Sequence, residues 1–148
     1  DHKKDVYDED LIALVDDAVL RHNDRIRFVS LQVVCGSKGP QTAELELEVD
    51  GQRQTAKANG NGPVDATFEA IKSIVPHDAV LKLYQVHAVT GGTDAQAEVT
   101  VRLEEAGKSV NGQGADYDTL VASARAYVNA LNKLLVKREK TAPAAISA

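Results

Sequence analysis

Two glycine pairs have the spacing that best suits the binding of a small molecule: Gly60-Asn61-Gly62 and Gly112-Gln113-Gly114. Each pair comes before a segment of helical period, and the free N–H groups at the start of a helix can hold a carboxylate. Neither pair has the further glycine or the Lys-Ser/Thr that phosphate-binding loops require. The alternative is a purely structural turn from strand to helix, in which glycine supplies a positive φ. The residues alone leave both interpretations open.

Signals for catalysis or metal binding are weak. The histidines are far apart and show no His-x-His or His-Glu-x-x-His spacing: His2, His22, His77 and His87. The single cysteine, Cys35, excludes an intrachain disulfide and a multi-thiolate metal site, and we expect it to be buried in a strand. No serine stands in a Gly-x-Ser-x-Gly elbow. We therefore expect no catalytic residue, no metal ligand and no cofactor in this chain.

The overall composition is that of a globular domain. Of the 148 residues, 43% are hydrophobic and 26% are charged, with a net charge of −5. Nucleic acid is disfavoured as the main partner because phosphate binding requires clustered positive charge, and no apolar run approaches the roughly 20 residues of a membrane-spanning helix. The chain starts at Asp1 and contains no Met, so we expect a piece of a longer protein. One cysteine and no signal peptide suggest the cytoplasm.

The first predicted element is a linker helix in the segment 1–26, where apolar residues recur at helical spacing: Leu11, Leu14, Val15, Ala18 and Val19. A strand is predicted over 28–35, and 42–49 alternates between apolar residues and glutamates, as a half-buried strand does. Asp50-Gly51 is the preferred pair of a two-residue type I′ hairpin turn. That turn predicts the register of the next strand: Val49 opposite Gln52, Glu48 opposite Arg53, Leu45 opposite Ala56, Glu44 opposite Lys57 and Ala43 opposite Ala58.

A helix is predicted over 64–75, with Pro63 at its first position and Pro76 after its end. The order then repeats: strand-like residues at 80–89, a turn at 90–94, an alternating strand at 97–103, a short third strand that ends at the second glycine pair, and a long helix. The sequence thus predicts an α+β fold of two pseudo-repeated β-β-β-α units. The predicted domains are the linker helix 1–26, a domain over 27–136 with units 27–76 and 80–136, and a flexible tail over 137–148.

The stretch Asn59-Gly60-Asn61-Gly62-Pro63-Val64-Asp65-Ala66 resembles the C-terminal regulatory domain of 2-isopropylmalate synthase, an enzyme of leucine biosynthesis. The resemblance runs from about Phe28 to Leu135. It implies that two such domains pair, and that leucine binds at the paired domain as a feedback inhibitor of a distant catalytic barrel. The resemblance implies that the following residues bind the leucine ligand: Gly60, Asn61, Gly62, Pro63, Val64, Asp65, Leu81, Tyr84, Ala88, Asp94 and Ala95.

The catalytic parts of that family, an acidic metal ligand and a His-x-His pair on a TIM barrel, are absent from this sequence. The resemblance therefore implies a non-catalytic domain of an acetyl-CoA-condensing acyltransferase, whose barrel would use a divalent metal and acetyl-CoA. The implied partners are L-leucine, a second copy in a homodimer, and the catalytic domain of the same parent chain.

The residues themselves suit a leucine zwitterion. N–H groups from Gly62 to Val64 could hold the carboxylate, and Asp94 or Asp65 could bind the ammonium group. Small aliphatic side chains would leave room for the isobutyl group: Val64, Leu81, Ala88 and Ala95. One methyl group is worth only about 1–3 kcal/mol in such a socket. Isoleucine, the inhibitor of citramalate synthase with its related domain, is therefore an alternative ligand, and a dimerisation module without a ligand is a second alternative.

Overall fold

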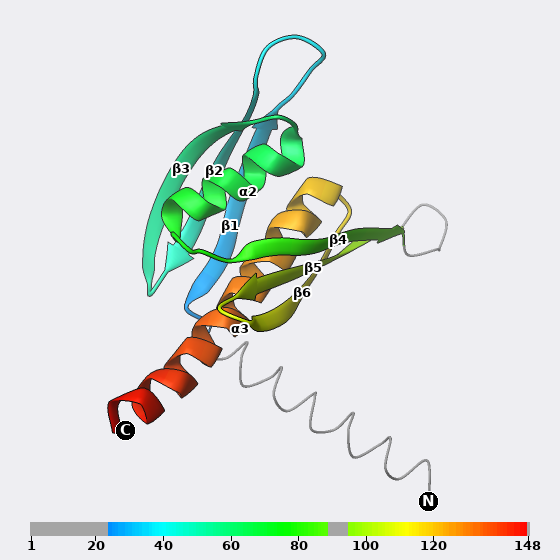
Figure 1. Cartoon of the computed structure of the whole chain (residues 1–148). Helices are drawn as coiled ribbons and strands as arrows, with labels where there is room; N and C mark the ends of the chain where they lie inside the picture. The colour runs from blue at the N-terminus through cyan, green and yellow to red at the C-terminus, as the bar shows by residue number, and fades with distance from the viewer. Residues whose placement is uncertain (1–23, 89–94, 148) are drawn as a thin grey trace, which may run out of the picture.

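The computed structural model describes residues 24–88 and 95–147 and shows two β-β-β-α units in succession (Figure 1). The predicted linker helix and the predicted turn at 90–94 fall on residues 1–23 and 89–94, outside the described residues. The first unit consists of β1 (Ile26–Val34), β2 (Gln41–Val49), β3 (Gln52–Gly60) and α2 (Pro63–Ile74). The second consists of β4 (Val80–Ala88), β5 (Ala97–Glu105), β6 (Lys108–Asp116) and α3 (Thr119–Ser147). The predicted α+β fold of two repeated units is confirmed.

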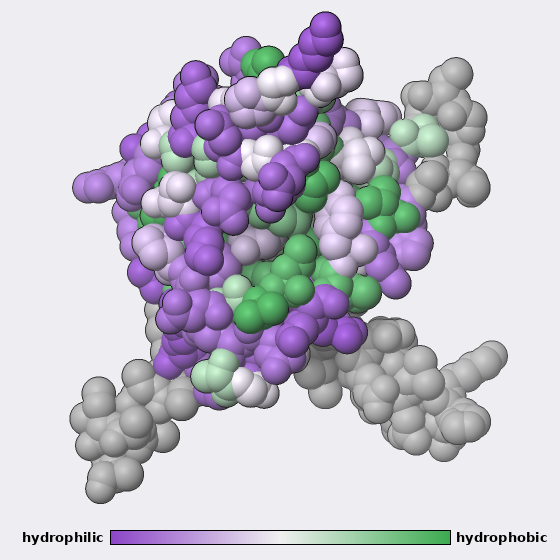
Figure 2. Space-filling model, turned by 45° about the horizontal axis from the view of Figure 1, so that its top comes forward, coloured by the Kyte–Doolittle hydropathy of each residue, from purple (hydrophilic) through white to green (hydrophobic). Residues whose placement is uncertain are grey.

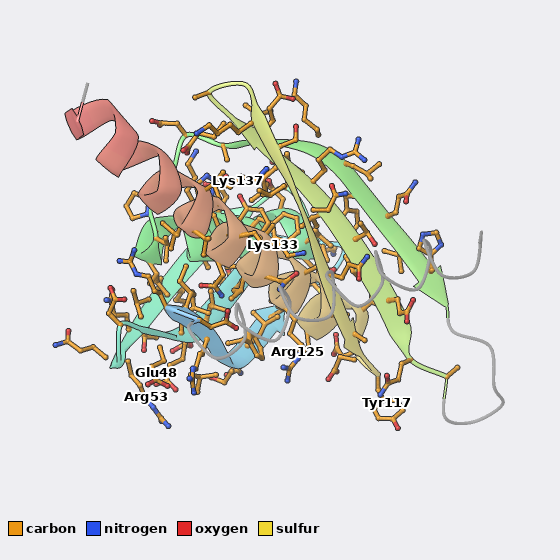
Figure 3. All side chains as sticks on the ribbon, turned by 90° about the horizontal axis from the view of Figure 1, so that it is seen from below. Glu48, Arg53, Tyr117, Arg125, Lys133 and Lys137 are labelled. Atoms are coloured by element: carbon orange, nitrogen blue, oxygen red, sulfur yellow. The ribbon has the colours of Figure 1, made fainter. Side chains whose placement is uncertain are left out.

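Each unit holds an antiparallel three-stranded sheet, in the orders β1-β2-β3 and β4-β5-β6. In the first sheet, Asp50 has φ 51° and Gly51 has φ 84°, as a type I′ turn requires of both central residues. All five predicted cross-strand pairs of β2 and β3 are present. Arg53 lies opposite Glu48 (Figure 3) and also pairs diagonally with Glu46 at 3.7 Å. The outer face of β2 is therefore a charged, solvated surface, as the alternation of glutamates predicts.

The second sheet corrects one prediction. Strand β6 is neither short nor ended by the glycine pair: it runs nine residues to Asp116, and Gly112 and Gly114 lie inside it opposite Val101 and Val99. The hairpin turn is Ala106-Gly107, with φ 52° and 79°. Ala-Gly lacks the Asn or Asp that marks such a turn in a sequence, and glycines inside a strand resemble strand breakers. Local signals therefore place the end of this strand too early.

The two helices enclose a common core with the two sheets (Figure 1). Helix α2 covers β2 and β3, while α3 covers β5 and β6 and also reaches β1 and α2. The ring centroids of Phe68 on α2 and Tyr127 on α3 are 4.4 Å apart, so aromatic contact joins the units at their centre. Fully buried aliphatic side chains from both sheets complete this core: Ile26, Leu45, Leu47, Val99, Val101 and Leu103.

Helix α3 continues to Ser147, through the segment 137–147 for which a flexible tail was predicted. Two side chains hold the start of that segment against the second sheet. Lys137 Nζ donates to Ser109 O at 2.9 Å, and Arg138 Nε donates to Glu105 Oε1 at 2.8 Å. Lys133, one turn earlier, donates to Asn111 O at 2.9 Å (Figure 3). The alanine content that suggests a frayed tail also suits a helix, because alanine has the highest helix propensity.

Candidate functional site

The start of α2 offers backbone N–H groups that no side chain of the helix caps. Gly62 is the N-cap residue, has φ −163° and carries no side-chain hydrogen bond to the helix start, and Pro63 follows at the first helical position. Ala66 N donates to Gly62 O at 2.9 Å, so the helical ladder begins there. The preceding N–H groups of Val64 and Asp65 belong to the first turn, whose donors have no partner within a helix. A Cβ added at Gly62 would meet no atom within 4 Å, so open space adjoins these donors.

Gly60 serves a different purpose from Gly62. A Cβ at Gly60 would lie 2.4 Å from Ala66 N and 2.7 Å from Asp65 Oδ2, so only glycine lets the end of β3 approach α2 this closely. As a purely structural turn, the two glycine pairs were predicted to have positive φ angles. That prediction is wrong, because the described glycines with positive φ are Gly39, Gly51 and Gly107. Close approach, together with open space at Gly62, accounts for the first glycine pair.

Asp65 closes the turn that leads into α2. Its Oδ2 accepts the N–H of Asn61 at 3.0 Å, an acidic residue at the third helical position reaching back to the chain before the helix. The side chain is exposed, and its other oxygen is not engaged by this hydrogen bond. The hydrogen bond gives Asp65 a structural role that the sequence analysis missed.

The second glycine pair does not form an equivalent site, which corrects the expectation of two similar helix starts. A Cβ at Gly112 would lie 2.1 Å from Ala126 O, and one at Gly114 would lie 2.4 Å from Ala122 O. These glycines therefore allow β6 to pack against α3. The start of α3 is instead capped by Asp118, whose Oδ1 accepts the N–H groups of Leu120 at 2.7 Å and Val121 at 3.3 Å. A carboxylate of the chain itself occupies the second helix start.

Tyr84 is brought close to both helices. Its ring packs edge-on against Phe68 of α2, with centroids 5.9 Å apart, and its hydroxyl lies 2.7 Å from Ser123 Oγ on α3. Ser123 donates its only hydroxyl proton to Thr119 O at 2.7 Å, so the Tyr84 hydroxyl donates to Ser123. Phe68 follows Val64 by one helical turn on the same face. Tyr84 therefore lies along the α2 face that begins at the uncapped helix start. Sequence reasoning missed Ser123, because its partner is 39 residues away.

The other predicted ligand residues are only partly assembled in the single chain. Leu81 lies on the same face of β4 as Tyr84 and is 40% exposed. Ala88 ends β4 opposite Ala97, Ala95 is exposed, and Asp94 falls outside the described residues. Hollows of about 340 and 240 Å³ are lined by other residues on the two sheets: Ser30, Leu31, Gln32, Glu44, Leu45, Glu46 and Thr55 line one, and Glu98, Val99, Thr100, Gln113, Gly114 and Ala115 the other. Neither hollow is lined by a residue that was predicted to bind the leucine ligand.

His77 and Tyr127 form a buried hydrogen-bonded pair of side chains. His77 Nδ1 accepts the N–H of Ala79 at 3.1 Å, so the ring carries its proton on Nε2 and donates it to the Tyr127 hydroxyl at 2.9 Å. Burial lowers the pKa of His77, and nearby Lys72 lowers it further. Burial likewise raises the pKa of Tyr127 to about 12. Both groups are therefore neutral near pH 7, and the hydrogen bond between them is buried.

The structure also tests the predictions for Cys35 and for metal ligands. Cys35 is exposed just after β1, so the expectation of a buried strand cysteine is wrong; the strand ends one residue earlier, at Val34. Within residues 24–88 and 95–147, no three His, Cys, Asp or Glu side chains are grouped so that they could hold a metal ion. None of the helices described there is long and apolar enough to cross a membrane.

The fold and the site together define a class: a pseudo-symmetric α+β domain of two β-β-β-α units, in which one of two related helix starts is left uncapped. A family model described as "LeuA allosteric (dimerisation) domain" matches residues 5–135. The chain therefore belongs to the LeuA allosteric (dimerisation) domain family.

Relatives of known name agree with this assignment. The chain is 63% identical over 145 residues to the 2-isopropylmalate synthase of Caulobacter sp. (strain K31), a match that covers 98% of the chain and 28% of that protein. It is 57% identical over 145 residues to the enzyme of Afipia carboxidovorans, with the same coverage. It is 56% identical over all 148 residues to the enzyme of Nitrobacter hamburgensis, again 28% of that protein. The chain spans little more than a quarter of the length of these relatives.

Proposed function

We propose that this chain is the feedback-regulatory part of a cytoplasmic 2-isopropylmalate synthase, binds L-leucine at the start of α2, and acts as a homodimer without catalysing a reaction itself. The condensation of acetyl-CoA, with its divalent metal, would belong to another part of the parent enzyme. The family match and the relatives support the regulatory assignment. The uncapped start of α2 beside the open space at Gly62 carries the proposal for the ligand.

The two helix starts differ in a way that suits one amino acid per chain. At α3 the Asp118 carboxylate accepts the first-turn N–H groups, whereas at α2 no side chain does so. A leucine carboxylate would take at α2 the place that Asp118 takes at α3, with the favourable end of the helix dipole behind it. Asp94 would bind the ammonium group. Val64, Leu81 and the ring of Tyr84 would contact the isobutyl group, together with Ala88 and Ala95.

Isothermal titration calorimetry with leucine, isoleucine and valine tests the proposal on this chain. Leucine should bind with the highest affinity. Gly62→Asp should remove binding, because it places a chain carboxylate on the same N–H groups. The fold should survive this change, since aspartate is a favoured N-cap residue and a Cβ there meets nothing.

Asp118→Gly is the matched control, because it removes the carboxylate from the other helix start. It should lower the free energy of unfolding only slightly, by roughly 0.3 kcal/mol, and leave leucine affinity unchanged. Tighter binding of isoleucine than of leucine would assign the domain to the citramalate synthase type. A folded dimer that binds none of the three amino acids would contradict the proposal and favour a dimerisation module without a ligand.

A further inference from the structure

Strand β4 exposes apolar side chains on the face that the rest of the sheet buries. Leu81 pairs with Leu103 and Val86 pairs with Val99, and residues directly opposite each other in a sheet share a face. Leu103 and Val99 are at most 1% exposed, whereas Leu81 is 40% and Val86 45% exposed. Half-buried Tyr84 lies between them on the same face. We call Leu81, Tyr84 and Val86 the β4 strip.

The same positions in the first unit are covered. Because Val49 and Leu45 correspond to Leu103 and Val99 in the repeat, their partners Ile26 and Leu31 correspond to Leu81 and Val86. Ile26 is 1% exposed and Leu31 is partly buried against the core. The two units therefore differ in the protection of their first strand and not in its apolar character.

Helix α3 provides this cover in the first unit. Besides its own sheet it reaches β1, where the guanidinium of Arg125 lies 5.1 Å from the centroid of the Phe28 ring and Asn132 hydrogen-bonds both backbone groups of Ile26. Helix α2, of 12 residues, contributes the Phe68 contact with Tyr84. Within the described residues, Leu81 and Val86 have no comparable cover. Figure 2 shows hydrophobic residues reaching the surface among hydrophilic ones.

We infer that the β4 strip is the apolar centre of the homodimer interface, and that its occupant is a second copy of this chain. The inference rests on the proposed function, from which it takes the homodimer. The family to which the chain belongs is described as a dimerisation domain, and a two-fold interface uses the same surface of both copies.

Analytical ultracentrifugation of the chain over a range of concentrations tests this inference. The wild type should approach twice its mass of 15.8 kDa. Val86→Lys should raise the dimer dissociation constant by about tenfold or more, because a lysine would be buried without a partner. Val34→Lys is the matched control: Val34 is 63% exposed at the end of β1, and the change should leave the dimer intact. Val86 is chosen over Leu81 because Val86 is not among the residues proposed to bind the leucine ligand.

Hydrogen exchange provides a second readout, since amides of β4 should be better protected at concentrations where the wild type is dimeric.

A folded Val86→Lys variant that dimerises as well as Val34→Lys would overturn the interface but not the leucine proposal; segment 1–23 or another protein would then be the occupant. A wild type that stays monomeric throughout would overturn the interface and the proposed homodimer together. A monomeric Val86→Lys variant beside a wild-type dimer that binds no leucine would support the interface and contradict the leucine proposal.

Discussion

At the scale of single residues, His77 is buried in the segment that joins the two units, and both of its ring nitrogens are hydrogen-bonded. Protonating the ring would break the hydrogen bond from Ala79 N to Nδ1. The charged groups around the ring act in both directions: Lys72 and Arg138 lower its pKa, while Glu105 and Asp78 raise it, and burial has the largest effect and lowers it. His77 is therefore held neutral in the folded chain.

This gives a pH prediction. Because the folded pKa of His77 lies below its ordinary value of 6.5, the unfolded chain binds more protons, and stability is lost as the pH falls below about 6.5 and through the folded pKa. The slope of this contribution cannot exceed about 1.4 kcal/mol per pH unit. Urea unfolding at several pH values measures it. His77→Gln should flatten the dependence in this window, whereas His87→Gln, at an exposed position, should preserve it. An unchanged slope in His77→Gln would show that another group is responsible.

At the scale of elements, the glycines of β6 determine how closely strand and helix approach. The atoms nearest to a Cβ at Gly112 include backbone atoms of α3, Ala126 O at 2.1 Å and Ala130 N at 2.5 Å, which cannot turn aside as a flexible side chain can. Small residues on α3 complete the contact. Gly62, at the start of the other helix, has no such neighbour. The two glycine pairs look alike in the sequence but perform different tasks.

Gly112→Ala should therefore force β6 and α3 apart and lower the free energy of unfolding by about 1–3 kcal/mol or more. Gly36→Ala is the control, because a Cβ there meets nothing within 4 Å and the residue has no positive φ; its effect should stay within about 0.5 kcal/mol. Chemical unfolding of both variants measures the difference. Equal stability of the two would mean that the strand and the helix can separate without cost.

At the scale of the whole molecule, Asn132 joins the two ends of the domain. Its Oδ1 accepts the N–H of Ile26 at 3.0 Å and its Nδ2 donates to Ile26 O at 2.8 Å, across 106 residues of sequence. Both groups of Ile26 are buried and depend on this side chain. The contact fixes α3 against the first strand of the other unit, so that the two units form one core.

Asn132→Ala should lower the free energy of unfolding by about 2–4 kcal/mol, because it leaves a buried donor and a buried acceptor without partners. Asn129→Ala on the same helix is the comparison. Asn129 Oδ1 accepts the N–H of Gln113 at 3.0 Å at an exposed position, where water can replace it, so the loss should be about 0.5–1.5 kcal/mol. Thermal and urea unfolding should rank the two variants in this order. The reverse order would contradict the role of Asn132 in joining the units.

Features that depend on residues close together in the chain could be predicted from the sequence alone. The alternation of 42–49 and the pair Asp50-Gly51 were sufficient for the full register of the first hairpin. The repeat predicted the order of the elements, and Pro63 marked the start of α2. These signals are local, because strand alternation, turn conformation and helix capping act over a few residues.

Three properties become visible only in the folded chain: which glycine adjoins open space, which helix start is already filled by Asp118, and which edge strand stays uncovered. Gly62, Gly112 and Gly114 differ in what packs against them. Strand β1 is contacted by the helix of the other unit, whereas Leu81 and Val86 of β4 stay exposed. The physical reason is that these properties arise from contacts between segments up to 106 residues apart. No local pattern records which of two similar segments such a contact will reach.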